Sequence, residues 1–197
     1  MNSHDLADTL RKLADHGAGN IIIVPGGGIF ADQVRFLQKE LQIDEETAHR
    51  MALRAMEQFG NLLLSLDPRF HAARSIEAMN EWIGKKEIPV WFPFNMIADN
   101  PAIQSTWDIT SDSLSLWLAQ LLDCQNLVLL KSVEPDNNNY SAEYLSQCGF
   151  LDNAFAEMIH DTFVQPWWLF YEQIDTFFNL LDDKDNSTTG MKIITRQ

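Results

Sequence analysis

The chain has 197 residues and a formal net charge of −14, with 28 acidic side chains against 14 basic ones. This length predicts one domain over residues 1–197, large enough to bury a hydrophobic core. So acidic a chain is unsuited to nucleic acids and anionic membranes, which both require clustered basic surface. A nucleotide is still a plausible ligand, because a phosphate site needs only backbone amides and one or two cations.

The cysteines, Cys124 and Cys148, fit no metal-binding spacing and are expected to be free thiols in a reducing compartment. The N-terminal segment has no apolar signal core, so no export signal is expected. The most apolar stretch, residues 162–181, is interrupted by Pro166 and Glu172, which argues against a membrane span. We therefore expect a cytoplasmic protein with no membrane partner and no metal site built from its own side chains.

The hydrophobic pattern predicts helices that alternate with short strands. Helices are expected over residues 3–16, 29–41, 44–67, 74–86 and 110–123, and strands over residues 20–25, 88–94, 126–133 and 188–196. Asp44 is the expected N-cap of the third helix, and residues 134–160 are expected to hold loops and short helices. This alternation predicts an α/β fold with a mainly parallel, doubly wound sheet.

A run of three glycines follows the first apolar segment, in the stretch IIIVPGGGIFADQVR at residues 21–35. Glycines can adopt φ > 0 and let an anion approach the backbone, and the helix that follows would point its N-terminus at that anion. Gly26, Gly27 and Gly28 are therefore candidate phosphate- or substrate-binding residues. The spacing matches neither GxGxxG nor GxxxxGKS, and a tight turn without a ligand is the alternative.

A second candidate stretch is WDITSDSLSLWLA, which ends a polar loop and begins a helix. Thr110 and Ser111 are natural N-caps, and Asp112 lies in the first turn, where a carboxylate is stabilised. These residues, with Ser113, either bind a ligand and orient a lysine or simply begin a helix well. Lys131 ends the apolar strand LVLLK, where it could contact a phosphate or lie in water.

Taken in this order, IIIVPGGGIFADQVR, WDITSDSLSLWLAQLLD and NLVLLKSV resemble the amino acid kinase superfamily, which includes aspartate, acetylglutamate and uridylate kinases. Within it, the chain is most similar to the small kinases of one-carbon cofactor biosynthesis. The archaeal representative phosphorylates an aminomethylfuran-methyl phosphate on the way to methanofuran. The resemblance covers roughly residues 5–131 well and the C-terminal third poorly.

The resemblance implies a three-layer α/β/α sandwich in which ATP, with Mg²⁺, and a small phosphoryl acceptor meet at the carboxyl edge of the sheet. It places the glycines at 26–28 by the acceptor and the transferred phosphate, and Thr110, Ser111 and Ser113 in the phosphate-binding segment. Asp112 matches the aspartate that organises the catalytic lysines, and Lys131 is the candidate catalytic cation. Such enzymes align two substrates and stabilise spreading charge, without a nucleophile of their own.

Two motifs of the family do not occur in the chain. The K-x-G-G-S loop that normally precedes the first helix is absent, so either the start codon lies further upstream or this copy has lost that lysine. The D-G-I/V-Y motif after the third strand is replaced by SVEPDNNNY. The sequence therefore predicts a kinase in methanofuran- or tetrahydromethanopterin-linked one-carbon metabolism, with a non-catalytic ligand-binding or partner subunit as the alternative.

The aromatic stretch after Pro166 allows three interpretations: core, an oligomer interface or a lid over a ring-shaped substrate. If the sheet lacks its first strand, its edge needs a cover. Homodimerisation through this aromatic region is one way to provide it.

Overall fold

The computed structural model describes residues 3–135, 139–175, 177 and 192–193. The chain forms two compact units, which we call the N-terminal unit (Ala7–Trp107) and the C-terminal unit (Asp108–Gln197, with Met1–Leu6). The expectation of a single domain stays a prediction. No described helix is long and apolar enough to cross a membrane.

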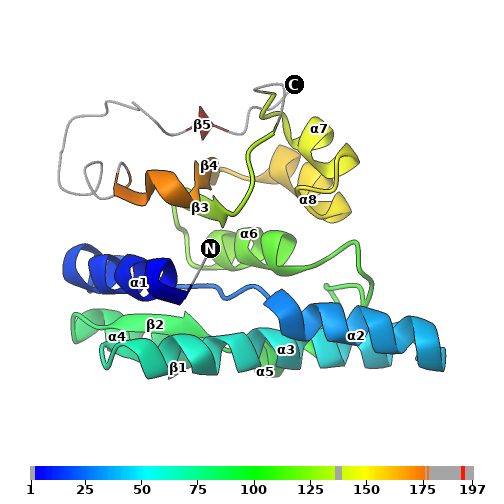
Figure 1. The fold of residues 1–197 in the computed structure, drawn as a ribbon, viewed down its shortest axis with the longest axis horizontal. Coiled ribbons are helices and arrows are strands. Elements are labelled where there is room, and N and C mark those ends of the chain that lie inside the picture. The colour runs from blue at the N-terminus through cyan, green and yellow to red at the C-terminus, as the bar shows by residue number, and fades with distance from the viewer. Residues whose placement is uncertain (1–2, 136–138, 176, 178–191, 194–197) are drawn as a thin grey trace. The chain divides into compact units, whose positions relative to one another are not determined.

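The N-terminal unit is mostly helical around a short parallel strand pair (Figure 1). Its helices are α1 (Ser3–Gly17, of which the first residues belong to the other unit), α2 (Gly28–Leu41), α3 (Glu45–Leu66), α4 (Ile76–Gly84) and α5 (Phe94–Ile97). Strand β1 (Phe70–Ala73) pairs in parallel with β2 (Ile88–Trp91). All four residues of β2 are buried, as expected for a parallel strand that is covered on both faces.

Local signals set the helix boundaries in this unit. The Asp44 carboxylate accepts a 2.8 Å hydrogen bond from the amide of Thr47, which confirms Asp44 as the N-cap of α3. The hydroxyl of Ser75 caps α4 in the same way, through the amide of Ala78. These caps supply acceptors for N–H groups that a helix N-terminus leaves without a partner.

The strand predicted over residues 20–25 is reduced to a single bridge between Ile23 and Val90. The Ile23 amide donates to the carbonyl of Pro89 at 2.9 Å, and its carbonyl accepts from the amide of Trp91 at 2.8 Å. Residues 21–24 are only partly buried, although an apolar run without alternation is typical of a strand covered on both faces. The segment runs beside β2 for one residue before it turns into the glycine run.

The described part of the C-terminal unit contains a three-stranded sheet and five helical segments. Strand β3 (Asn126–Lys131) is parallel to β4 (Gln165–Phe170), which is antiparallel to β5 (Lys192–Ile193). The helical segments that precede β4 are α6 (Ser111–Leu121), α7 (Ala142–Gln147), α8 (Asn153–Met158) and the 3-10 turn η1 (Ile159–Asp161), and the turn η2 (Tyr171–Gln173) follows it. Only two residues of the strand predicted over residues 188–196 are described.

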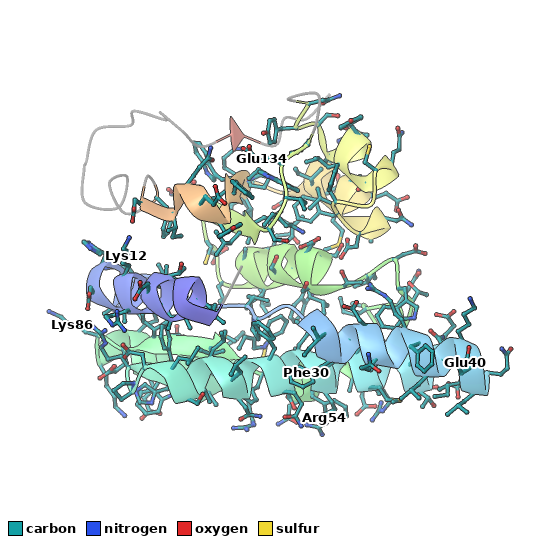
Figure 2. The ribbon with its side chains drawn as sticks, in the orientation of Figure 1. Lys12, Phe30, Glu40, Arg54, Lys86 and Glu134 are labelled. Carbon is teal, nitrogen blue, oxygen red and sulfur yellow. The ribbon has the colours of Figure 1, made fainter. Side chains whose placement is uncertain are left out.

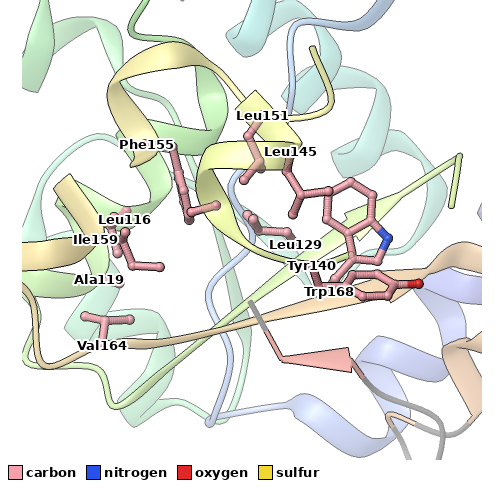
Figure 3. Close-up of a cluster of buried hydrophobic side chains, with 11 residues drawn as sticks. Leu116, Ala119, Leu129, Tyr140, Leu145, Leu151, Phe155, Ile159, Val164 and Trp168 are labelled. Carbon is pink, nitrogen blue, oxygen red and sulfur yellow. The ribbon is translucent and has the colours of Figure 1, made fainter. Parts of the chain in front are cut away.

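The core of this unit joins α6, β3, β4 and the α7–α8 segment (Figure 3). Trp168 is 1% exposed and makes edge-to-face contacts with Tyr140 and Phe150. Leu169 is also fully buried, so the interpretation of the aromatic stretch as core is confirmed for these β4 residues. By contrast, β3 is not covered on both faces, because Leu130 is 39% exposed.

The sequence did not predict four of the described elements, which are β1, β4, α5 and the turn η2. Each is three to six residues long. The β1 sequence, FHAA, shows no clear alternation of apolar and polar residues. Strand β4 contains Pro166, and proline is normally unfavourable inside a strand. These two segments form strands because β1 pairs with β2 and β4 pairs with β3, and not because of a local sequence pattern.

Candidate functional site

The glycine run forms the entry into α2 in the N-terminal unit. Gly27 is the N-cap with φ −74°, and no side chain caps the helix. The left-handed conformation is at Gly28, with φ +50°. A Cβ at Gly28 would lie 3.1 Å from the ring of Phe59, so the position is closed to larger residues by both conformation and space. Because no side chain caps α2, its first backbone amides are available to bind an anion.

An open groove of about 510 Å³ begins beside this loop and runs between α2, α3 and α5. Phe30, in the first turn of α2, and Arg54, in α3, both line the groove (Figure 2). Arg50 also lines the groove, and the ring of Phe94 packs against both arginines. Its centroid is 3.4 Å from the guanidinium carbon of Arg54 and 5.3 Å from that of Arg50. The groove therefore combines aromatic faces with two cations.

The two arginines have different partners. Arg54 pairs at 2.6 Å with Glu57, whose side chain is 10% exposed and also accepts from the Phe94 amide at 3.2 Å. Arg50 donates to the carbonyl oxygen of Ala98 at 3.0 Å and pairs at 2.8 Å with Asp99, whose side chain is 87% exposed. Exposed ion pairs contribute little and exchange readily. Arg50 can therefore exchange Asp99 for an anionic ligand while it keeps its bond to Ala98.

In the C-terminal unit, the structure brings Asp112 and Lys131 together. The Lys131 ammonium lies 2.8 and 2.7 Å from the two carboxylate oxygens of Asp112, and 3.0 Å from the carbonyl oxygen of Phe150. The side chains are 15% exposed for Asp112 and 19% for Lys131. An ammonium has three N–H donors, and these three acceptors match them in number. The ring centroid of Trp168 lies 5.6 Å from the same nitrogen.

Burial raises the pKa of the Asp112 carboxyl above its ordinary value. The Lys131 ammonium opposes this effect, and the nearby Asp152 carboxylate adds to it. A carboxylate that is desolvated in this way depends on its cation to stay ionised. The two side chains are thus electrostatically dependent on each other.

Asp152, at the N-terminus of α8, holds the first turn of α6. Its carboxylate accepts from the Thr110 amide at 2.7 Å, the Thr110 hydroxyl at 2.9 Å and the Ser113 amide at 3.0 Å. It also accepts from the Ser113 hydroxyl and from the amide of Phe155 at 3.1 Å. The carboxylate therefore caps α6 from outside as well as its own helix.

The predicted site residues thus fall into two groups. Gly26, Gly27 and Gly28 belong to the N-terminal unit, and the TSDS segment and Lys131 to the C-terminal unit. Thr110 is the N-cap residue of α6 as predicted, although its hydroxyl donates to Asp152 instead of capping the helix. Ser111 begins α6 and is partly buried, while Ser113 is fully buried.

The sequence reasoning missed Asp152, Arg50 and Arg54. Asp152 could have been recognised as an N-cap before NAFAE, but its contact with α6 joins positions about forty residues apart. Nothing in the helical pattern of α3 distinguishes the two arginines from ordinary surface residues. Only the packing of Phe94 against them marks the groove.

The described residues contain no group of three or more His, Cys, Asp or Glu side chains that could hold a metal ion. Both oxygens of Asp112 contact Lys131, and both oxygens of Asp152 accept hydrogen bonds from protein donors. These carboxylates therefore do not fit a Mg²⁺ site in this conformation.

The chain was compared with protein families, with characterised proteins and with solved structures. No family model matches the chain. The chain is 30% identical over 135 residues to (5-(aminomethyl)furan-3-yl)methyl phosphate kinase of Methanocaldococcus jannaschii, a match that covers 66% of this chain and 59% of that protein. The matched region thus spans under two thirds of the relative's length.

Solved structures give the fold. The structure superposes on uridylate kinase from Archaeoglobus fulgidus with a TM-score of 0.68 at 14% identity, over 98% of this chain and 94% of that one. It superposes on UMP kinase from Ureaplasma parvum with a TM-score of 0.66 at 15% identity, over 97% and 87%. The fold is that of the amino acid kinases. The predicted α/β class is confirmed, and the matches together support a relationship to the amino acid kinase superfamily.

Proposed function

We propose that the protein is an ATP-dependent phosphotransferase of the amino acid kinase type, acting on a small anionic acceptor. The observation that carries the proposal is the buried pair of Asp112 and Lys131 at the N-terminus of α6, a charged site in a chain related to kinases. Phosphoryl transfer requires positioned positive charge and backbone donors more than covalent chemistry. Lys131 supplies the positive charge, and Asp112 holds it in position.

In the proposed reaction an acceptor oxygen attacks the γ-phosphorus of ATP, and the bond to the ADP oxygen breaks. Lys131 contributes a cation whose direction Asp112 fixes. When one contact between the ammonium and the Asp112 carboxylate opens, one N–H becomes available for a phosphate oxygen. Mg²⁺ would arrive with the phosphates of the nucleotide.

The acceptor is proposed to lie in the groove beside the glycine run. Phe30 and Phe94 offer faces for a planar ring, and Arg50 offers a cation for an attached phosphate or carboxylate. The named substrate of the Methanocaldococcus relative, a furan that carries a methyl phosphate, has this combination of groups. On this basis we place the reaction in methanofuran- or tetrahydromethanopterin-linked one-carbon metabolism.

The test is a turnover assay with ATP, Mg²⁺ and (5-(aminomethyl)furan-3-yl)methyl phosphate, with UMP as the alternative acceptor. ADP release is measured together with phosphorus NMR of the product. We expect acceptor-dependent ADP that disappears on chelation of Mg²⁺ and falls about 100-fold or more in Lys131→Met. Lys85→Met, which removes an exposed pair with Glu81 on α4, is the matched control and should retain activity. Absence of ADP with both acceptors would contradict the proposal for these substrates.

The second candidate function is a non-catalytic ligand-binding subunit. One observation favours it: the ammonium of Lys131 already has three acceptors, so no donor is left for phosphate without rearrangement. In this case ATP would raise the melting temperature of the protein while no acceptor gives ADP. Both functions are compatible with a homodimer, for which the 60% exposed Phe163 just before β4 is a candidate contact. Sedimentation of the wild type and of Phe163→Ser would test the dimer.

A further inference from the structure

The segment that contains Asp152 reaches the charged pair at two points, through the neighbour of Asp112 and through a contact with Lys131. On one side the Asp152 carboxylate accepts from the amide of Ser113, the residue next to Asp112. On the other side Phe150, two residues earlier, places its carbonyl 3.0 Å from the Lys131 ammonium. One tight segment, residues 150–152, therefore holds the turn that carries the carboxylate and also contacts the cation.

The number of donors on this carboxylate exceeds what an N-cap needs. An N-cap side chain normally accepts from one or two amides of its own helix. The Asp152 carboxylate accepts from one amide of α8 and from four donors, two amides and two hydroxyls, on Thr110 and Ser113. Most of its hydrogen bonds thus fix α6 rather than α8.

Fixing the first turn of α6 also fixes the direction of the Asp112 side chain. Both carboxylate oxygens of Asp112 must face the ammonium to keep the contacts of 2.8 and 2.7 Å. If Thr110 and Ser113 lose their common acceptor, the turn can fray, and the carboxylate then moves away from Lys131. A misplacement of about 1 Å in a reacting group can cost about 100-fold in rate.

We propose that Asp152 is a positioning residue for the Asp112–Lys131 pair, and that it acts through the first turn of α6. The inference rests on the proposed function for its effect on turnover, but its structural part does not. It predicts that removing the Asp152 carboxylate disturbs Lys131 even though the two side chains are not bonded to each other.

The first measurement is independent of activity. Nitrogen-15 NMR of lysine side chains reports ammonium groups whose protons are protected by hydrogen bonds, and Lys131→Arg assigns the signal. We expect the Lys131 signal to disappear or broaden in Asp152→Ala and to remain in Ser141→Ala. Ser141 caps α7 in the same unit through the amide of Tyr144 and makes no hydrogen bond to Asp112 or Lys131, so its variant controls for the loss of a cap. A protected Lys131 signal in Asp152→Ala would overturn the proposal.

The second measurement is a double-mutant cycle on kcat. If Asp152 acts through Asp112, Asp152→Ala should lower kcat about 10- to 100-fold in the wild type and less than about 3-fold in Asp112→Asn. A purely structural cap would lower kcat by the same factor in both backgrounds, which would contradict the proposal. If Asp152→Ala does not fold, Asp152→Asn serves in both experiments, because its amide keeps one acceptor oxygen and removes the charge. Absence of turnover in every form would count against the proposed function, while the NMR result would still decide the positioning role.

Discussion

The ammonium of Lys131, at the end of β3, contacts both carboxylate oxygens of Asp112, nineteen positions earlier in the first turn of α6. Both side chains are less than one fifth exposed. Removing one partner of a buried pair leaves an unpaired charge, which typically costs about 3–5 kcal/mol, whereas replacing both is often far less costly.

We therefore expect Lys131→Met and Asp112→Asn each to destabilise the protein by about 3 kcal/mol, the low end of that range, because some water reaches the pair. The double variant should lose less than the sum of the two. Urea denaturation of the four proteins measures the coupling. Strictly additive losses would show that the pair contributes nothing to stability.

The Asp112 carboxyl should lose its proton at a higher pH than an ordinary aspartate. Burial raises the pKa of its carboxyl above the ordinary 3.8, so the folded state binds this proton more tightly than the unfolded state. The contribution of this carboxyl to stability is then greatest below about pH 4 and is lost as the pH rises through the raised pKa. The ion pair with Lys131 forms over the same range, because it needs the ionised carboxylate.

Carbon-13 NMR of labelled aspartates should show a titration midpoint for Asp112 above 3.8. In Lys131→Met the midpoint should move further up, since the Lys131 ammonium lowers the pKa. A downward shift in this variant would show that Lys131 does not stabilise the carboxylate. If the proposed function holds, kcat should decline as the pH falls through the same midpoint.

Gly28 should tolerate no side chain. In Gly28→Ala the new Cβ meets a left-handed backbone and lies 3.1 Å from the Phe59 ring, so we expect a loss of about 1–2 kcal/mol in the free energy of unfolding. Gly84→Ala is the matched control. A Cβ there meets nothing within 4 Å, and the residue lies in α4, so stability should be unchanged or raised by up to about 1 kcal/mol. Equal stability of the two variants would refute the role of the left-handed position.

Arg50→Gln should weaken acceptor binding more than it affects chemistry. The guanidinium exchanges a highly exposed Asp99 for an anionic group of the acceptor, so its loss should raise the KM for the acceptor about 10-fold or more with kcat within about 3-fold. Arg11→Gln removes an exposed pair with Asp8 on α1 and should change neither constant. If Arg50→Gln leaves KM unchanged, the groove is not the acceptor site.

Several features were predictable because they depend on neighbouring residues. The apolar periods of α2, α3 and α6, the cap at Asp44 and the strands at β2 and β3 are all written within short windows of sequence. The glycine run before α2 belongs to this class, although the sequence could not say which glycine takes φ > 0. The structure places that conformation at Gly28.

The sequence by itself determined the α/β class and the residue types that a phosphate site needs. Tertiary structure decided which of them meet. Three contacts join positions that no local pattern relates. They are the ion pair of Asp112 with Lys131, the hydrogen bonds of Asp152 to the first turn of α6, and the packing of Arg54 on the Phe94 ring. A side chain's period along a helix fixes only the face on which it lies. The residue that neutralises it there is brought in by the packing of other elements.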